Sequence, residues 1–381
     1  MIRVLNVVHT LGYGGVEVTL LRGLPHFQER GVEVGVACPV PEGPLADAFV
    51  RRGVRVHAIR CPMPRLFAAW PLARIVRECN YDIVHSRLGY NAGTHIIGSL
   101  IAGRPSIVSI HNGRPTSELL GWRKGDPRRL ALEPWIWLNR AIIGRFARQV
   151  VGHSRANLDS FWPSWEEEPE RFSVVLNGIE LPKGVREKDK ERLALGLQFD
   201  GPLVVHVGSF KREKNHGELL HIFAALRRRY PGSRLVLVGE GGLREEVERK
   251  VRELALDEAV AFVGHQRQPD RYLAAADLLI FPSSSEGYGN VLVEAQAVGL
   301  PIVASDIPAH REAVAEAQHR FLYPLGDVGR AVELAAEQIE AARQGRNAWV
   351  EESRKVILER NSIEAMVESL VRIYRTVLSH V

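Results

Sequence analysis

Residues 276–305 read ADLLIFPSSSEGYGNVLVEAQAVGLPIVAS, and this stretch decides the fold. Residues 278–281 predict a buried strand, the Pro-Ser segment after them a loop, residues 290–299 a short helix, and residues 301–305 a second strand. This order is typical of a parallel sheet, in which ligands bind at the carboxyl ends of the strands.

Two glutamates flank the turn that opens the predicted helix. The turn, Gly287-Tyr288-Gly289-Asn290, offers free backbone N–H groups at the positive end of a helix dipole, which suits a phosphate. Glu294 follows Asn290 by about one helical turn, so it can face the same ligand and accept hydrogen bonds from sugar hydroxyls. Solvated helix charges would explain an isolated pair of glutamates, but the glycines and the flanking strands favour a ligand site around Glu286 and Glu294.

Glu286 and Glu294, with seven residues between them and Gly299-Leu300-Pro301 after them, resemble the E-x7-E signature of the retaining family 4 glycosyltransferases. The resemblance implies an α/β chain with the GT-B fold: two doubly wound Rossmann-like domains that face each other across a cleft, and a C-terminal helix that crosses back to the first domain. We expect an acceptor-binding domain over 1–180, a nucleotide-sugar-binding domain over 181–362, and the crossing helix over 363–381.

Length and composition agree with a globular protein of two domains. The chain has 381 residues, of which 45% are hydrophobic and 25% charged. Its three cysteines have no metal-ligand spacing, which favours a reducing compartment. Neither a signal peptide nor a membrane-spanning run is evident, so we expect a cytoplasmic protein, with peripheral contact at the inner membrane face.

Charge is distributed unevenly along the chain. Residues 1–165 carry 21 Lys and Arg against 11 Asp and Glu, whereas the remainder has a net charge of −5. A basic half suits phosphates or an anionic membrane surface. A nucleic-acid-binding protein is therefore an alternative, but the chain lacks an aromatic and basic recognition module, and we expect no nucleic acid partner.

A glycine-rich loop follows the first predicted strand. Residues 4–8 and 32–38 predict two parallel strands joined by this loop and a helix. We reject a dinucleotide-binding dehydrogenase, because strand 32–38 ends in Ala37-Cys38-Pro39 without an acidic residue for a ribose, and the glycine spacing departs from the fingerprint. The resemblance places Gly15 of the loop near the donor phosphate, while a tight turn alone explains Gly12 equally well.

Histidines end two further strands of the first half. His85 follows residues 83–84 and His111 follows residues 106–110, at sheet edges where ligands bind, although a histidine with a purely structural role is the commoner outcome. The resemblance implies that His111 is catalytic and approaches the sugar hydroxyls. It also implies that His85, Arg87 and Ser154 lie on the acceptor side. Relatives often have His-x-His where this chain has Arg87, which suggests an anionic acceptor.

Residues 122–148 mix aromatic and aliphatic residues with arginines. A helix over this stretch would gather apolar residues on one side with cations at its edge, as interfacial helices do. A core helix with basic solvated flanks is equally compatible with the pattern. We therefore treat contact with an anionic membrane as a hypothesis.

A cationic loop follows the first strand of the second half, residues 203–207. Cations there would neutralise a departing diphosphate. The family resemblance selects Lys214 as catalytic together with Glu286, and Lys211 or Arg212 as the second cation, because Ser209 stands where the family usually has arginine. Charged residues over 183–192 predict a linker between the two domains.

The remaining donor-side residues rest on the same resemblance. Gly239 and Gln266 end two later strands, the latter near the base, and the full expected set of donor-binding residues is Gly15, Lys211, Arg212, Gly239, Gln266, Gly287, Tyr288, Gly289, Asn290 and Glu294. The chain has no Asp-x-Asp pair, so we expect neither a metal nor another cofactor.

The predicted function is hexosyl transfer from a nucleotide-diphosphate sugar, with a UDP-sugar favoured, to an acceptor hydroxyl with retention of configuration. The expected acceptor is a lipid-linked or small glycan in polysaccharide assembly. Three enzyme alternatives stay open: a sugar-nucleotide hydrolase, a phosphorylase-like enzyme, and a transferase acting on amino-sugar natural products. The two former enzymes would release the nucleotide without an acceptor alcohol.

Overall fold

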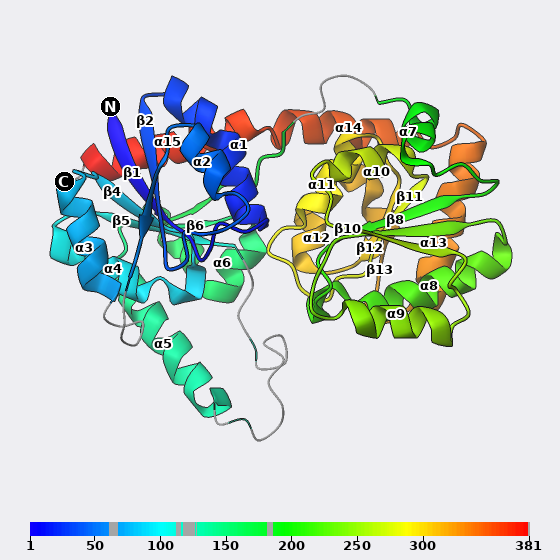
Figure 1. Cartoon of the computed structure of the whole chain (residues 1–381), viewed down its shortest axis with the longest axis horizontal. Coiled ribbons are helices and arrows are strands. Elements are labelled where there is room, and N and C mark those ends of the chain that lie inside the picture. The colour runs from blue at the N-terminus through cyan, green and yellow to red at the C-terminus, as the bar shows by residue number, and fades with distance from the viewer. Residues whose placement is uncertain (61–67, 112–115, 117–125, 127, 181–185, 380–381) are drawn as a thin grey trace. The chain divides into compact units, whose positions relative to one another are not determined.

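The computed structural model describes residues 1–60, 68–111, 116, 126, 128–180 and 186–379. The chain divides into two compact units, Met1–Glu180 with Asn361–Val381, and Leu181–Arg360. The predicted domain boundaries lie at 180/181 and 362/363. Each unit is described by itself below, and Figure 1 shows that each has one twisted sheet with helices on both faces.

The first unit is built on a seven-stranded parallel sheet in the order β3-β2-β1-β4-β5-β6-β7. Its central strands are rich in Val and Ile and are buried, as both faces carry helices, whereas the edge strand of residues 55–58 is only partly buried. They are β1 (Ile2–Val7), β2 (Val32–Cys38), β3 (Arg55–Ala58), β4 (Ile83–Ser86), β5 (Ser106–Ile110), β6 (Gln149–Gly152) and β7 (Phe172–Val174). Its helices are α1 (Gly15–Glu29), α2 (Ala46–Arg51), α3 (Ala69–Glu78), α4 (Gly93–Ala102), α5 (Arg128–Phe146), α6 (Arg155–Phe161) and α15 (Ile363–Ser379).

The second unit has a six-stranded parallel sheet in the order β10-β9-β8-β11-β12-β13. The strands are β8 (Leu203–Val207), β9 (Arg234–Val238), β10 (Val260–Gly264), β11 (Leu278–Phe281), β12 (Ile302–Ser305) and β13 (Leu322–Tyr323). The helices are α7 (Lys188–Leu195), α8 (His216–Arg229), α9 (Arg244–Glu253), α10 (Pro269–Ala275), α11 (Asn290–Ala297), α12 (Pro308–Ala313), α13 (Val328–Arg343) and α14 (Ala348–Arg360).

Both sheets reverse their strand order once. The reversal lies between β1 and β4 in the first unit and between β8 and β11 in the second. At such a switch point the loops after the two neighbouring strands turn to opposite faces of the sheet, which leaves room for a ligand between them. The two switch points are therefore where functional groups are to be sought.

The last helix, α15, belongs to the core of the first unit. Val367, Leu370 and Val371 are buried with apolar residues of α1, and the ring of Tyr374 stacks on that of Phe27 with centroids 6.2 Å apart. The crossing helix expected from the resemblance thus supplies buried side chains to the sheet that begins the chain.

The charged segment expected to be a linker is partly helical. Residues 181–185 lie outside the described residues, but α7 is a helix that is anchored to the second unit. Lys188 and Arg192 both pair with the carboxylate of Asp277, at 2.8 and 2.5 Å. The linker prediction is wrong for these residues, because cations that suggest a solvated run instead meet an acidic residue far along the sequence.

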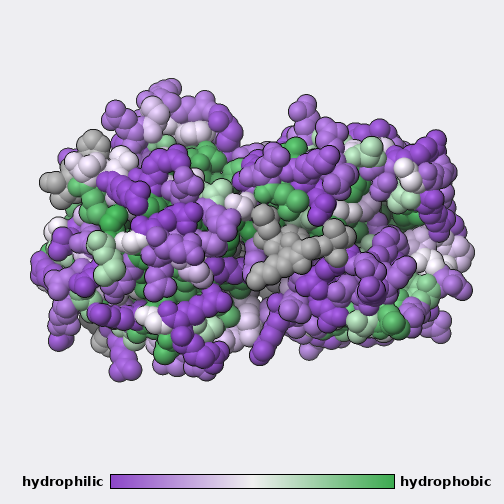
Figure 2. All heavy atoms as spheres, turned by 90° about the horizontal axis from the view of Figure 1, so that it is seen from above, coloured by the Kyte–Doolittle hydropathy of each residue, from purple (hydrophilic) through white to green (hydrophobic). Residues whose placement is uncertain are grey.

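Hydrophilic side chains dominate the face seen in Figure 2, with hydrophobic ones scattered among them. Among the residues that the structure describes, no helix is both long and apolar enough to cross a bilayer.

The dependence of the first unit on α15 can be tested through one hydroxyl group. Tyr374→Phe removes the hydrogen bond between its hydroxyl and His85, 2.8 Å in length, and leaves a buried ring nitrogen without a partner. We expect a loss of about 1 to 2 kcal/mol in the free energy of unfolding. Hydrogen exchange measured by mass spectrometry should rise in β4 and β5.

Tyr323→Phe is the matched control in the second unit, where the hydroxyl donates to Glu218 at 2.9 Å. Its effect on exchange should be confined to that unit. Equal exchange changes in β4 for both variants would contradict the assignment.

Candidate active site

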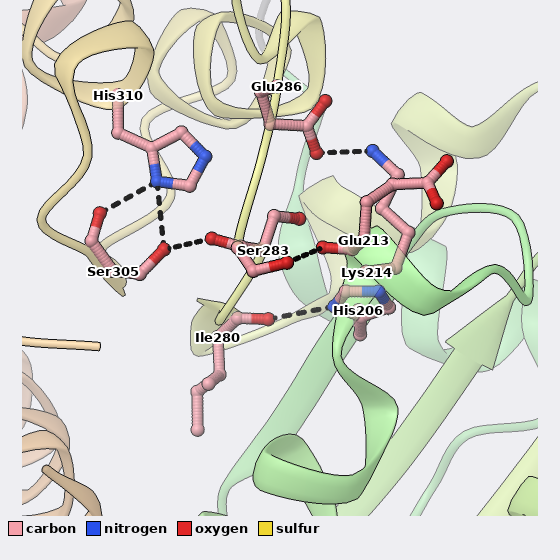
Figure 3. Close-up of polar contacts among 9 residues, drawn as sticks. His206, Glu213, Lys214, Ile280, Ser283, Glu286, Ser305 and His310 are labelled. Carbon is pink, nitrogen blue, oxygen red and sulfur yellow. Dashed lines mark hydrogen bonds and ion pairs between the residues drawn. The ribbon is translucent and has the colours of Figure 1, made fainter. Parts of the chain in front are cut away.

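The switch point of the second unit brings a cation and a carboxylate together. Lys214 ends a short helical turn after β8, and Glu286 lies in the loop between β11 and α11. The Lys214 Nζ lies 2.5 Å from Glu286 Oε1, and both side chains are mostly buried, with 15% and 13% of their surface exposed. Figure 3 shows them reaching toward each other from their two loops. The Lys214 ammonium also lies 5.0 Å from the centre of the Phe281 ring.

Backbone contacts hold the loops of this switch point close together. Ser284 N–H donates to the Glu213 carbonyl at 2.8 Å, which ties the Glu286 loop to the Lys214 turn. Gly239 has a φ of 147°, and a Cβ there would lie 2.0 Å from the Gly208 carbonyl oxygen. Only glycine permits this approach, so the loop after β9 supports the loop that carries Lys214.

The start of α11 lies beside the ion pair. Gly289 precedes the helix with a φ of 95°, and Tyr288 has its side chain buried, with 2% exposed. Burial of the ring leaves the backbone of this turn as the part that can meet a ligand, at the positive end of the helix. Asn290 and Glu294 are both partly buried on the first turns of α11.

The other predicted donor-side residues are placed more loosely. Lys211 and Arg212 are exposed, while Lys214 turns inward to Glu286. Gln266, in the loop after β10, donates to the carbonyl of Val263 in that strand at 2.5 Å. It lines a cavity of about 380 Å³ with Leu195, His265, Arg267, Gln268, Arg271 and Tyr272.

A buried histidine completes this side of the second unit. His310 of α12 is fully buried, and its Nδ1 lies 2.7 Å from the Ser305 carbonyl oxygen and 3.2 Å from the Ser305 hydroxyl. That hydroxyl in turn donates to the Ser283 carbonyl at 2.5 Å. Burial lowers the pKa of His310 to about 4, although the Glu286 carboxylate opposes this, so the ring is neutral at pH 7.

At the switch point of the first unit, the carboxylate of Glu17 folds back over the glycine loop. A Cβ on Gly14 would lie 2.2 Å from Glu17 Oε2. Glu17 is buried, and burial raises the pKa of its carboxyl, while its backbone hydrogen bond and the Arg87 charge lower it. Gly15, predicted as a donor-binding residue, is exposed at the first position of α1.

Arg87, directly after β4, points into the first unit. Its Nε donates to Asn6 at 2.8 Å, and its guanidinium is also hydrogen-bonded to the Tyr374 hydroxyl. Tyr374 lies 2.8 Å from His85 Nδ1, and His85 Nε2 lies 2.8 Å from the Ser109 hydroxyl. Burial keeps His85 neutral by lowering its pKa well below the usual value.

His111 stacks on a second histidine. The ring centroids of His111 and His153 are 4.1 Å apart with an interplanar angle of 20°. His153 is fixed by donation from its Nδ1 to the Val175 carbonyl at 2.9 Å. Burial and the neighbouring His153 lower the pKa of His111 well below its usual value, so a neutral imidazole stands at the end of β5.

Three predicted acceptor-side residues do not present free groups at this edge. His85 is fully buried and both its ring nitrogens have partners within the unit. Arg87 is 7% exposed and bonded to Asn6. Ser154 is buried, and its hydroxyl caps α6 by accepting from Asn157 N–H at 3.0 Å. In this structure the three residues support the edge on which His111 lies, and their contact with an acceptor stays a prediction.

Four residues of these sites were given no site role by the sequence analysis. Glu17, His153, Tyr374 and His310 reach the switch points through the fold, and Tyr374 does so across 289 residues from His85. In the described ranges, no group of three or more His, Cys, Asp or Glu side chains is arranged to hold a metal ion.

Two family models match almost the whole chain between them. The Glycosyltransferase Family 4 model matches residues 13–183, and the model named Glycosyl transferases group 1 matches residues 187–356. The two models together show a glycosyltransferase, and its two units have the fold of the GT-B class. Within that class, the first half of the chain matches the family 4 type and the second half the group 1 type.

Individual relatives agree with this assignment. The putative glycosyltransferase EpsF of Bacillus subtilis is 31% identical over 59% of this chain, which spans 58% of that relative's length. The 2-deoxystreptamine N-acetyl-D-glucosaminyltransferase of Streptomyces fradiae is 25% identical over 87% of this chain and 84% of its own. The crystal structure of HepE of Anabaena in complex with UDP covers all of both chains with a TM-score of 0.80 at 19% identity, which shows the shared fold.

The close approach of Gly239 to Gly208 leads to a stability prediction. Gly239→Ala places a methyl group against a carbonyl oxygen at a φ that alanine rarely adopts. We expect a loss of about 3 kcal/mol in the free energy of unfolding, measured in urea.

Gly242→Ala is the control, because a Cβ there meets no atom within 4 Å. It should change stability by less than about 0.5 kcal/mol. Similar stability of the two variants would show that the loop after β9 does not need its close approach.

Proposed function

We propose that the protein transfers a hexosyl group from a nucleotide-diphosphate sugar, with a UDP-sugar favoured, to a glycan hydroxyl with retention of anomeric configuration. The observation that carries this proposal is the Lys214 and Glu286 pair, at 2.5 Å, beside the start of α11. A cation and helix N–H groups suit a diphosphate, and a carboxylate suits sugar hydroxyls. A nucleotide-sugar offers both in one molecule.

Each donor-side group has a role in this proposal. Lys214 and the backbone around Tyr288 to Asn290 stabilise the negative charge that develops on the leaving diphosphate. Glu286 accepts from hydroxyls of the donor sugar, and Glu294 from the ribose. Lys211 and Arg212, which are exposed, can turn to the diphosphate as the second cation in place of the arginine that Ser209 replaces.

The acceptor side is assigned to the first unit. His111 is a neutral imidazole at the end of β5, which can accept a hydrogen bond from a hydroxyl. We propose front-face attack, in which the leaving phosphate helps to deprotonate the acceptor hydroxyl. No metal ion takes part in the proposed reaction.

A lipid-linked glycan in polysaccharide assembly is the proposed acceptor, in line with a Campylobacter jejuni relative named for a diphospho-undecaprenol acceptor and a Salmonella typhi relative named for Vi polysaccharide biosynthesis. A small soluble acceptor is the second candidate. It is favoured by the S. fradiae relative, whose name gives 2-deoxystreptamine and whose similarity extends over 87% of this chain.

Donor binding can be tested without knowledge of the acceptor. One of UDP, GDP and ADP, with UDP expected, should raise the melting temperature of the chain without added metal, since a ligand of the folded state stabilises it.

Lys214→Ala should lower kcat by about 100-fold. Glu294→Ala should weaken donor binding by about tenfold, through loss of a hydrogen bond to a charged group.

Arg249→Ala is the control, because its side chain lies exposed on α9, and turnover should be unchanged. A melting temperature that no nucleotide shifts would contradict the proposed function. Nucleotide release at full rate without any acceptor would identify a hydrolase instead.

We place the reaction in the cytoplasm, at the inner face of the membrane. Helix α5 supplies a surface for peripheral contact with that membrane. Its inward face buries Leu132, Ile136 and Ile143. Its outward face exposes Leu130 by 83% and Trp137 by 71%. Leu138, Phe146, Arg145 and Arg148 are also exposed. Apolar groups together with cations suit the headgroup region of an anionic bilayer.

The membrane hypothesis predicts sedimentation of the pure chain with anionic liposomes at low salt. Trp137→Ser should weaken this binding by about tenfold. Trp70→Ser is the matched control, since Trp70 is 66% exposed on α3. Wild-type protein that stays in the supernatant would exclude membrane contact, and equal loss in both variants would exclude α5 as its site.

A further inference from the structure

His310 packs beside the predicted donor-binding groups of the second unit. A Cβ on Gly289 would lie 3.4 Å from its Cδ2, so the ring packs against the turn that opens α11. Figure 3 shows its Nδ1 edge turned to Ser305 and its Nε2 edge turned to the side on which Glu286 lies. The ring therefore separates a fixed backbone anchor from the Lys214 and Glu286 pair.

The anchor determines where the imidazole carries its proton. Ser305 offers its carbonyl oxygen at 2.7 Å, and its hydroxyl already donates to the Ser283 carbonyl. Both Ser305 oxygens therefore face Nδ1 as acceptors, so Nδ1 must be the protonated nitrogen. In the neutral ring Nε2 is then a bare acceptor.

Nε2 is buried and has no hydrogen-bond partner among the described residues. A buried acceptor without a partner costs about 1 to 3 kcal/mol. A proton on Nε2 would convert it to a donor that a carboxylate can accept from. Burial and the Lys214 ammonium lower the pKa of His310, whereas the Glu286 and Asp306 carboxylates raise it.

A nucleoside diphosphate changes this balance. Its phosphates compete with Glu286 for the Lys214 ammonium and add negative charge beside the ring. Both changes favour a positive charge on His310.

We propose that His310 is a positioning residue that takes up a proton at Nε2 when a nucleoside diphosphate binds, and then holds the Glu286 carboxylate while Lys214 turns to the diphosphate. The proton comes from solvent and forms a new N–H bond at Nε2, while Nδ1 keeps its own proton and goes on donating it to the Ser305 carbonyl. The inference rests on the proposed function, because it needs a diphosphate at this site.

Two other buried histidines of the second unit are poorer candidates. His206 donates from Nδ1 to the Ile280 carbonyl at 3.0 Å, and His216 stacks on Phe210 with centroids 4.6 Å apart. Burial lowers the pKa of both, and the Lys214 charge lowers it further, but Glu286 is not among the charges that act on either.

The test is titration calorimetry with UDP in two buffers of different ionisation enthalpy at about pH 7. Proton uptake by wild-type protein makes the observed enthalpy differ between the buffers. His310→Asn places an amide nitrogen near the position of Nδ1, which keeps the bond to Ser305 but removes Nε2. We expect this variant to lose the difference between buffers.

Affinity for UDP gives a second readout with a fixed sign. A ligand that draws a proton into the protein binds more tightly as the pH falls, so wild-type affinity should rise from about pH 8 to pH 6. The His310→Asn variant should show a flatter profile. Glu286→Gln, which removes the carboxylate that the proton serves, should also abolish uptake and tests the idea even if His310→Asn fails to fold.

His153→Asn is the matched control in the first unit. That ring is also buried, also donates from Nδ1 to a carbonyl, and also has a buried Nε2 without a partner among the described residues. Its proton uptake should equal that of wild type. UDP binding without proton uptake, or uptake that survives in His310→Asn, would overturn this inference but leave the proposed function standing. Failure of UDP, GDP and ADP all to bind would overturn the proposed function and this inference with it.

Discussion

The parallel arrangement of every strand is the constraint on which both candidate sites depend. Because all strands of a sheet run the same way, each loop that follows a strand leaves at one edge. The reversal of strand order between β8 and β11 then separates the loops that carry Lys214 and Glu286 to the two sides of one point. The same reversal between β1 and β4 sets Glu17 and the glycine loop beside Arg87. In each unit, the strand order therefore determines which loops, and so which side chains, lie close together at the edge of the sheet.

The two units handle buried polar groups differently. Among the described residues of the first, Arg87 is the buried cation, with hydrogen bonds to Asn6 and Tyr374 and neutral histidines around it. The second has an ion pair whose members are both mostly buried. Burial of charge is costly unless its partners stay in place, so the second unit gains from a ligand that can replace one partner by another. In the proposed function, this difference suits a rigid first unit that binds the acceptor and a second unit that responds to the donor.

The sequence was sufficient to predict elements and residues whose signals are local. Apolar runs ended by Gly or Pro located strands such as β8 and β11 to the residue. The glycine turn beside Glu286 predicted a ligand site, and the family resemblance added Lys214, which the fold does bring to Glu286. Long-range partners were beyond its reach: Lys188 and Arg192 of the charged run lie on a helix and pair with Asp277, far along the sequence. Both ring nitrogens of His85 have hydrogen-bond partners, and one of these partners, Tyr374, comes from the last helix.

Helix α15 also has a consequence for biosynthesis. The first unit is made of residues 1–180 and 361–381, so its core is incomplete while the intervening 180 residues are translated. At roughly 5 to 20 residues per second this interval lasts about 10 to 40 s. The second unit is continuous in sequence and can fold on the ribosome first. The nascent first unit meanwhile exposes the apolar surface of α1 that Leu370 and Tyr374 later cover, and this is the period in which a chaperone would have most to protect.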